Sequence, residues 1–178
     1  LSQMKTLGQH KGSLVAEIKE RQARILRTKI IYGEAKILVG KLNKRDRFIA
    51  GIALYVAEGS KTDGRAVFTN SDPRLIKFMT KWFKEFCKIS PNKFRGAIWL
   101  HEGLDEKVAK QYWSKLTGIP TNQFFKTYIA ADKKDSKKIR KNIHKYGVFS
   151  VSFSQSDIHR HIIGWISALI GAKITPVR

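Results

Sequence analysis

The chain has a single cysteine, few acidic residues and no long hydrophobic run. One thiol, Cys87, cannot form an internal disulfide, so a reducing cytoplasm is the compartment that suits this sequence. No apolar segment approaches the about 20 residues that cross a bilayer, and no signal-peptide pattern opens the chain. We therefore expect a cytoplasmic protein with no membrane partner. A glycine-rich phosphate loop, a zinc-ligand spacing and a Ser/His/Asp arrangement are also absent from the sequence, which excludes several enzyme classes.

The scarcity of acids leaves a large excess of positive charge. The 178 residues include 35 Lys and Arg but 14 Asp and Glu, so the formal net charge is +21. Such a chain repels itself unless a polyanion neutralises it. With a membrane surface excluded, double-stranded DNA is the expected partner and RNA the less favoured one.

The first 42 residues differ in character from the rest. They are rich in Lys and Arg, and Tyr32 is their one aromatic residue. An apolar stripe within residues 14–27 predicts a helix, and Gly33 and Gly40 are expected to interrupt the segment after it. We expect residues 1–42 to form a basic, partly helical arm that either rests on the next domain or lies along phosphates.

Residues 43–174 are predicted to form one aromatic-rich α+β domain with a mostly antiparallel sheet, followed by a tail at 175–178. Asn43 is expected to cap a helix over 44–58, and Asp63-Gly64 predicts a tight hairpin. Asp72-Pro73 is expected to begin a helix that runs to about residue 88. The remaining predicted elements are strands at 94–100, 123–130 and 148–153 and helices at 105–116 and 157–169.

The segment GIALYVAEG, residues 51–59, is the most informative part of the sequence. Ala53 and Ala57 are four residues apart and share one face of the predicted helix, where small side chains let a second helix backbone approach closely. That second helix belongs either to this chain or, by symmetry, to another copy. The residues expected at this helix packing surface are Ala50, Gly51, Ala53, Leu54 and Ala57. Glu58 ends the helix, where a carboxylate opposes the helix dipole and favours a bound cation; the alternative is an ordinary core helix whose last acid precedes a turn glycine.

This segment, the hairpin after it and Asn70-Ser71-Asp72-Pro73 before the next helix resemble the signature region of LAGLIDADG homing endonucleases and their DNA-binding or RNA-splicing relatives. The resemblance covers residues 42–173. It implies an αββαββα domain whose curved antiparallel sheet sits in the DNA major groove. One motif per chain implies a homodimer formed through the 46–58 helix.

The resemblance also implies site residues and a cofactor. Glu58 stands at the position of the family's metal-binding acid, so Mg²⁺ or Mn²⁺ is the expected cofactor and Glu58 a catalytic metal ligand. Lys126 or Lys61 would stabilise charge near the metal as a further catalytic residue. A dense run of cations between two predicted strands adds further phosphate contacts. The full set of expected DNA-contacting residues is Lys61, Arg65, Lys126, Lys133, Lys134, Lys137, Lys138, Arg140 and Lys141.

Two departures from the family pattern leave the activity open. The hairpin after Glu58 is short, and the helix at 105–116 is an extra element. Similar simplified domains in bacterial sporulation regulators bind DNA or partners without cutting. The two functions that remain are a metal-dependent homing-type endonuclease and a catalytically silent DNA-binding regulator. All four tryptophans are expected in the core, and base stacking requires that one of them be exposed.

Overall fold

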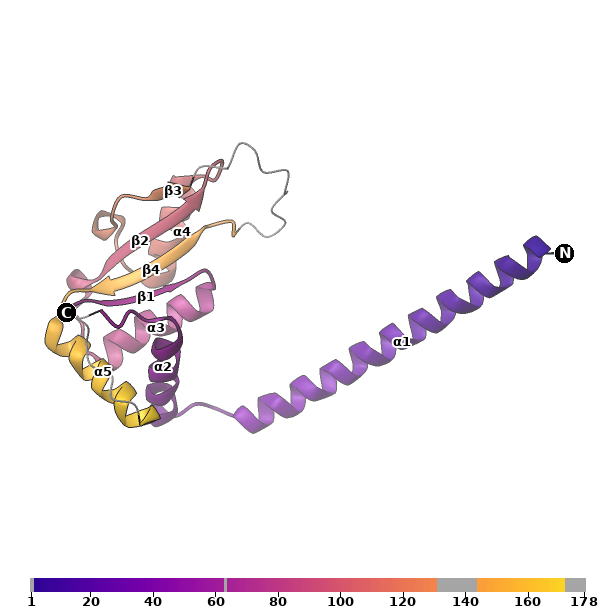
Figure 1. Ribbon diagram of the computed structural model, residues 1–178, viewed down its shortest axis with the longest axis horizontal. Coiled ribbons are helices and arrows are strands. Elements are labelled where there is room, and N and C mark those ends of the chain that lie inside the picture. Colours follow the sequence, from indigo (N-terminus) through magenta and orange to yellow (C-terminus); the bar gives the residue numbers. More distant parts are fainter. Residues whose placement is uncertain (1, 63, 131–143, 172–178) are drawn as a thin grey trace. The chain divides into compact units, whose positions relative to one another are not determined.

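The structure is a computed structural model that describes residues 2–62, 64–130 and 144–171, with side chains described from residue 13 onward. It separates into two compact units, one ending at Asn43 and one beginning at Lys44 (Figure 1). Within the described residues, no helix is long and apolar enough to cross a membrane.

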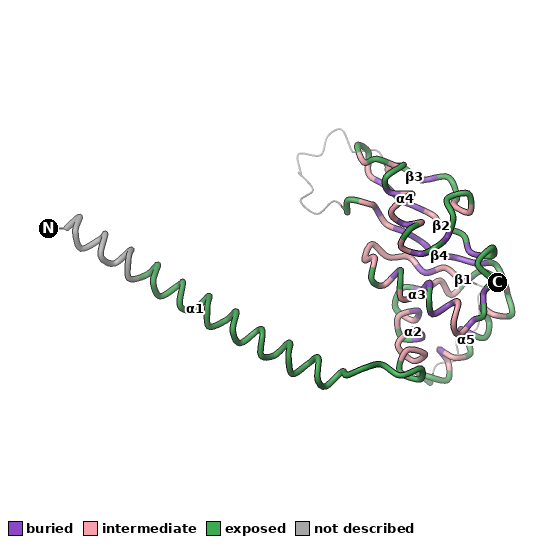
Figure 2. The backbone as a smooth tube through the Cα atoms, turned by 180° about the vertical axis from the view of Figure 1, so that it is seen from behind, coloured by how far each residue is buried: buried purple, intermediate pink, exposed green. Residues whose placement is uncertain are grey.

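The first unit is one uninterrupted helix, α1 (Ser2–Val39). Its residues from 13 to 39 are all exposed, as the colour of the tube in Figure 2 shows. The expected interruption at Gly33 is wrong, because a glycine inside a helix lowers its stability by only about 1 kcal/mol and does not break it. Gly40 does end the helix: its φ is +59°, and its N–H donates to the Lys36 carbonyl at 3.0 Å.

In its described residues the second unit contains four further α-helices and a four-stranded sheet. The helices are α2 (Lys44–Glu58), α3 (Pro73–Phe86), α4 (Glu106–Thr117) and α5 (Ser156–Ile170), with short 3-10 turns η1 (Pro91–Lys93) and η2 (Thr121–Gln123). The strands are β1 (Ala66–Asn70), β2 (Arg95–His101), β3 (Tyr128–Ala130) and β4 (Val148–Phe153), in the spatial order β1-β4-β2-β3. The α+β class is confirmed.

The sheet is mixed: the expectation of a mostly antiparallel sheet holds for two of its three strand pairings, whereas the wholly antiparallel sheet implied by the resemblance does not. β4 is antiparallel to both β1 and β2, but β3 runs parallel to β2 because α4 carries the chain back between them. The strand predicted over 123–130 is correct only for its last three residues. Phe124 turns inward and makes a single bridge to Gly96, where any side chain larger than hydrogen would collide with the Phe124 ring, and regular pairing begins only at Tyr128.

One face of the sheet is buried under α3 and α4, as Figure 1 shows. Phe83 of α3 lies edge-on to Phe153 of β4 with ring centroids 5.1 Å apart, and Trp113 of α4 stacks on Phe149 at 4.9 Å. α2 packs against both α3 and α5, and Trp165 of α5 reaches Trp82 of α3 with ring centroids 5.9 Å apart. Among the described helices of this unit, none covers the opposite face of the sheet, which we call the open face.

Candidate nucleic-acid interface

The open face is composed of alternate residues of the strands, because side chains of a strand point to opposite faces in turn. On β2 the residues facing the core are buried, whereas Arg95 and Trp99 on the other side are exposed. Strand register places the side chains of this face in three rows: Val67, Ser152 and Arg95; then Thr69, Ser150 and Ala97; then Val148, Trp99 and Tyr128. The face is therefore polar and cationic at one end and aromatic at the other.

Arg65 and Arg95 form the cationic end. The Arg65 guanidinium donates to the Ser152 hydroxyl at 2.7 Å and lies 4.9 Å from the centroid of the Phe125 ring. Arg95 donates to the carbonyls of Asn92 and Phe94, at 2.8 Å each. Both arginines remain exposed. Their guanidinium groups are thus held in position on the surface and have further N–H groups that these bonds do not use. This arrangement suits bidentate binding of phosphate.

The middle of the face carries small hydroxyl side chains. Thr69 and Ser150 hydrogen-bond to each other across β1 and β4. Ser150 is buried, at 2% exposed, and Thr69 is half-buried, so this pair joins β1 to β4 rather than facing a ligand. No large side chain separates the cationic end from the aromatic end in this row, since Ala97 is the third member.

Trp99 and Tyr128 form the aromatic end, and they are directly opposite each other in the register of β2 and β3. Trp99 is 40% exposed and Tyr128 61%. The expectation that every tryptophan belongs to the core is right for Trp82 and Trp113, whose indole N–H groups donate to the backbone carbonyls of Phe48 and Tyr146. It is wrong for Trp99, which lies on the side of β2 that no helix covers. Neither Trp99 nor Tyr128 was among the predicted contact residues, because alternation along a strand does not reveal which face is buried.

α2 packs against α3 of the same chain at Gly51, one of the residues predicted at its packing surface. A Cβ on Gly51 would lie well under 3.0 Å from the indole ring of Trp82, so Gly51 allows α2 and α3 to approach closely. Of the two alternatives for the second helix, Gly51 therefore faces the one in this chain, α3. Ala53 and Ala57 are exposed, with Ala50 and Leu54 half-buried beside them. Their contact with a second copy stays a prediction.

Glu58 is exposed at the end of α2, and Gly59 directs the chain from it into the sheet. The Lys61 ammonium donates to the carbonyls of Tyr55, Val56 and Gly59 at 3.2, 2.6 and 2.6 Å. These bonds satisfy carbonyls that α2 leaves open at its C-terminus. Burial lowers the pKa of Lys61, and the nearby charge of Glu58 opposes that shift. All three donors of Lys61 point into the protein, so in this arrangement it stabilises the helix end rather than facing a ligand.

The remaining predicted site residues are Lys126 and a set of cations between β3 and β4. Lys126 is exposed and precedes β3. The pKa of Glu106 on α4 is lowered first by a hydrogen bond from Lys110, and the charge of Lys126 is the smallest contribution to that shift. Lys133, Lys134, Lys137, Lys138, Arg140 and Lys141 lie outside the described residues. Within the part of the chain that the structure describes, no group of three or more His, Cys, Asp or Glu side chains is placed to hold a metal ion.

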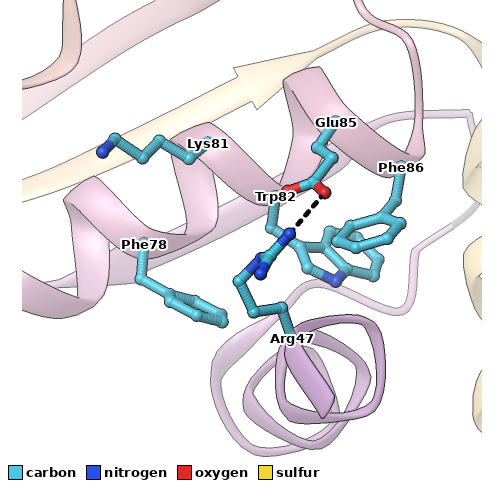
Figure 3. Close-up of a pocket in the computed structure, with 6 residues that line it drawn as sticks. All are labelled: Arg47, Phe78, Lys81, Trp82, Glu85 and Phe86. Carbon is cyan, nitrogen blue, oxygen red and sulfur yellow. Dashed lines mark hydrogen bonds and ion pairs between the residues drawn. The ribbon is translucent and has the colours of Figure 1, made fainter. Parts of the chain in front are cut away.

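A separate hollow of about 330 Å³ lies between α2 and α3 (Figure 3). Arg47 of α2 donates to Glu85 of α3 at 2.9 Å across it, and Phe78, Trp82 and Phe86 line its walls. The hydrogen bond from Arg47 lowers the pKa of Glu85. This hollow is closed by an ion pair that joins the two helices, and it lies near the first turn of α2, away from Glu58.

Comparison of the chain with protein-family models, with curated proteins and with solved structures found no match, so the resemblance to LAGLIDADG proteins rests on the sequence motif alone.

Proposed function

We propose that this protein binds double-stranded DNA through the open face of its sheet. The observation that carries the proposal is the position of Arg65, whose guanidinium is fixed on that face by Ser152 and Phe125 while remaining exposed. Arg95 lies in the same row, and the chain as a whole has a net charge of +21. Cations that displace condensed counterions from DNA account for most of the affinity of such proteins.

The test is the salt dependence of duplex binding, measured by fluorescence anisotropy for the wild type and for two variants that each lose one charge. In Arg65→Gln the cation is removed from the open face. In the matched control, Lys115→Gln, an exposed cation is removed from α4 on the helical side of the sheet.

Arg65→Gln is expected to weaken binding and to lower the slope of log K against log salt by about 0.9, the value for one phosphate contact. Lys115→Gln is expected to leave the slope unchanged. Equal effects of the two substitutions would show that only net charge matters and would refute the assignment of the open face.

The exposed small residues of α2 favour a homodimer in which two copies of this helix pack together. Ala53 and Ala57 present a thin surface that lets the helix of a second copy approach, and two copies would double the DNA-contacting surface. Light scattering of the wild type and of Ala53→Glu tests the dimer: the wild type is expected at twice the chain mass and the variant at the mass of one chain. A monomeric wild type at micromolar concentration would contradict it.

Metal-dependent hydrolysis of DNA is a second candidate, favoured by the exposed carboxylate of Glu58 at the end of that helix. One acid per chain suits Mg²⁺ or Mn²⁺ only if phosphate oxygens, water or the same residue of a second copy complete the ligands. A bound divalent ion would activate water and stabilise the leaving oxygen. In this scheme Glu58 holds the ion and the open face positions the duplex.

A randomised duplex library incubated with protein and Mg²⁺ tests the second candidate. The nuclease predicts cut molecules that disappear with Glu58→Gln, while Glu34→Gln, which removes an exposed acid of α1, continues to cut. Binding by all three proteins without cleavage would instead identify a catalytically silent DNA-binding regulator.

A further inference from the structure

We propose that the aromatic end of the open face binds one unpaired nucleobase, so that the protein prefers a nucleic acid with an unstacked base over an intact duplex. This inference rests on the proposed function and names the part of the nucleic acid that the open face recognises. Its basis is the geometry around Trp99 and Tyr128.

The exposure of these two rings lacks a structural explanation within the described fold. Elsewhere in the unit, Trp82 and Trp113 are about 2% and 1% exposed and their indole N–H groups are hydrogen-bonded to carbonyls. Trp99 and Tyr128 occupy paired positions on adjacent strands, which are spaced about 4.8 Å apart. Two exposed aromatic side chains so close together on a sheet are typical of a platform on which a base stacks.

A small pocket lies next to the two rings. It has a volume of about 120 Å³, and His101 and His144 contribute to its lining. Its wall depends on Gly147, which has a φ of +68°; a Cβ there would collide with the carbonyl of Trp99. The chain can therefore pass this close to β2 only at a glycine. Since water takes about 30 Å³ per molecule, the pocket has room for one planar heterocycle but not for a base pair.

His144 gives the pocket a polar edge. An imidazole nitrogen can donate or accept a hydrogen bond, as the edge of an unpaired base requires. A base within a duplex already uses this edge for pairing and both faces for stacking. Only a base that has left the stack can fill the pocket.

The cationic end completes the site on the same face. Arg95 is four residues before Trp99 on β2, so the two ends are about 13 Å apart at about 3.3 Å per residue. This distance corresponds to a few nucleotides of one strand. A base at Trp99 is thus compatible with phosphates of its neighbours at Arg65 and Arg95, and this positive charge is the reason for choosing a nucleobase over an uncharged aromatic ligand.

Three labelled probes of one sequence test the proposal by anisotropy: an intact duplex, the duplex with one unpaired central base, and the single strand. Each is made once in DNA and once in RNA. We expect the wild type to bind the unpaired-base probe roughly tenfold or more tighter than the intact duplex, in line with the usual contribution of base stacking. Quenching of tryptophan fluorescence should accompany that binding. Tighter binding of the DNA set or of the RNA set shows which backbone the site accepts, and either supports the base site.

Variants separate stacking from general binding. Trp99→Ala is expected to bind the unpaired-base duplex and the intact duplex with nearly equal affinity. Trp99→Phe, which keeps an aromatic ring, is expected to retain most of the preference for the unpaired-base duplex. Lys115→Gln, on the helical side, should leave this preference unchanged. Equal affinity of the wild type for the intact and unpaired-base duplexes would overturn this inference while leaving duplex binding in place. A wild type that binds none of the probes would refute the proposed function as well.

Discussion

Replacing Gly51 by alanine tests whether α2 packs closely against α3 of the same chain. A Cβ at this position would lie well under 3.0 Å from the Trp82 ring, so either α2 or the indole has to move. The indole N–H donates to the Phe48 carbonyl at 3.1 Å, and the ring also contacts Phe86 and Trp165. Movement of the indole would disturb each of these contacts.

The expected loss in the free energy of unfolding combines two costs and one gain. Overpacking a dense core costs about 1–3 kcal/mol. Weakening the indole hydrogen bond costs about 1 kcal/mol more. Alanine gains about 1 kcal/mol over glycine in helix propensity. We therefore expect Gly51→Ala to lower the free energy of unfolding by about 2 kcal/mol, equivalent to a fall in melting temperature of about 4–8 °C.

Gly164→Ala in α5 is the matched control. It is also a helical glycine, but nothing lies within 4 Å of a Cβ at that position. The same substitution should there raise the free energy of unfolding by about 0.5–1 kcal/mol. Urea unfolding followed by tryptophan fluorescence measures both variants.

Two results would refute the reasoning. Gly51→Ala at wild-type stability or above would show that the α2–α3 approach tolerates a methyl group. A loss that varies with protein concentration would place Gly51 at an interface between copies, because only dimer stability depends on concentration.

Four further predictions concern other parts of the domain. Lys61→Met keeps the stem but removes three bonds to carbonyls, so urea unfolding should show a loss of about 1–3 kcal/mol. Tyr55→Phe should cost about 1–2 kcal/mol in the same assay, because the Tyr55 hydroxyl donates to the Ser60 carbonyl and accepts from the Val67 N–H. Hydrogen bonds from Arg74 lower the pKa of Asp72 to about 2, so its contribution to stability is present above pH 4 and is lost as the pH falls toward 2; Asp72→Asn should flatten the acid limb of a stability–pH curve. Burial raises the pKa of the Cys87 thiol to about 12, so thiol titration at pH 8 should detect Cys87 only after unfolding, and rapid native labelling would contradict its burial.

The starts and ends of the elements could be predicted from the sequence wherever a few adjacent residues determine them. At the start of α3 the Asp72 side chain accepts a hydrogen bond from the Arg74 N–H, and at the start of α4 the Asp105 side chain accepts one from the Val108 N–H. Gly118 ends α4 with a φ of +71°. These caps act within one helical turn, so local chemistry is sufficient to identify them.

The surfaces of the candidate site could be predicted only in part. The excess of positive charge and the exposed acid at Glu58 can be read from composition and from the helix pattern. The cationic end of the open face contains Arg65, which was expected to contact DNA, but also Arg95 and Phe125, which were not. Their convergence depends on the pairing of three segments that are distant in the chain.

The sequence by itself determined the α+β class, the caps of α3 and α4 and the excess of positive charge. Only the tertiary structure decided that β3 runs parallel to β2, that Gly51 faces Trp82, that Lys61 closes the end of α2 and that Trp99 is exposed. The physical reason is range: caps and turns depend on neighbours a few residues away, whereas burial and helix contacts depend on which faces meet after distant segments pack. In β2, large apolar side chains occur on both faces, Ile98 and Leu100 on one and Trp99 on the other, and the helices that cover one face determine which side chains remain exposed.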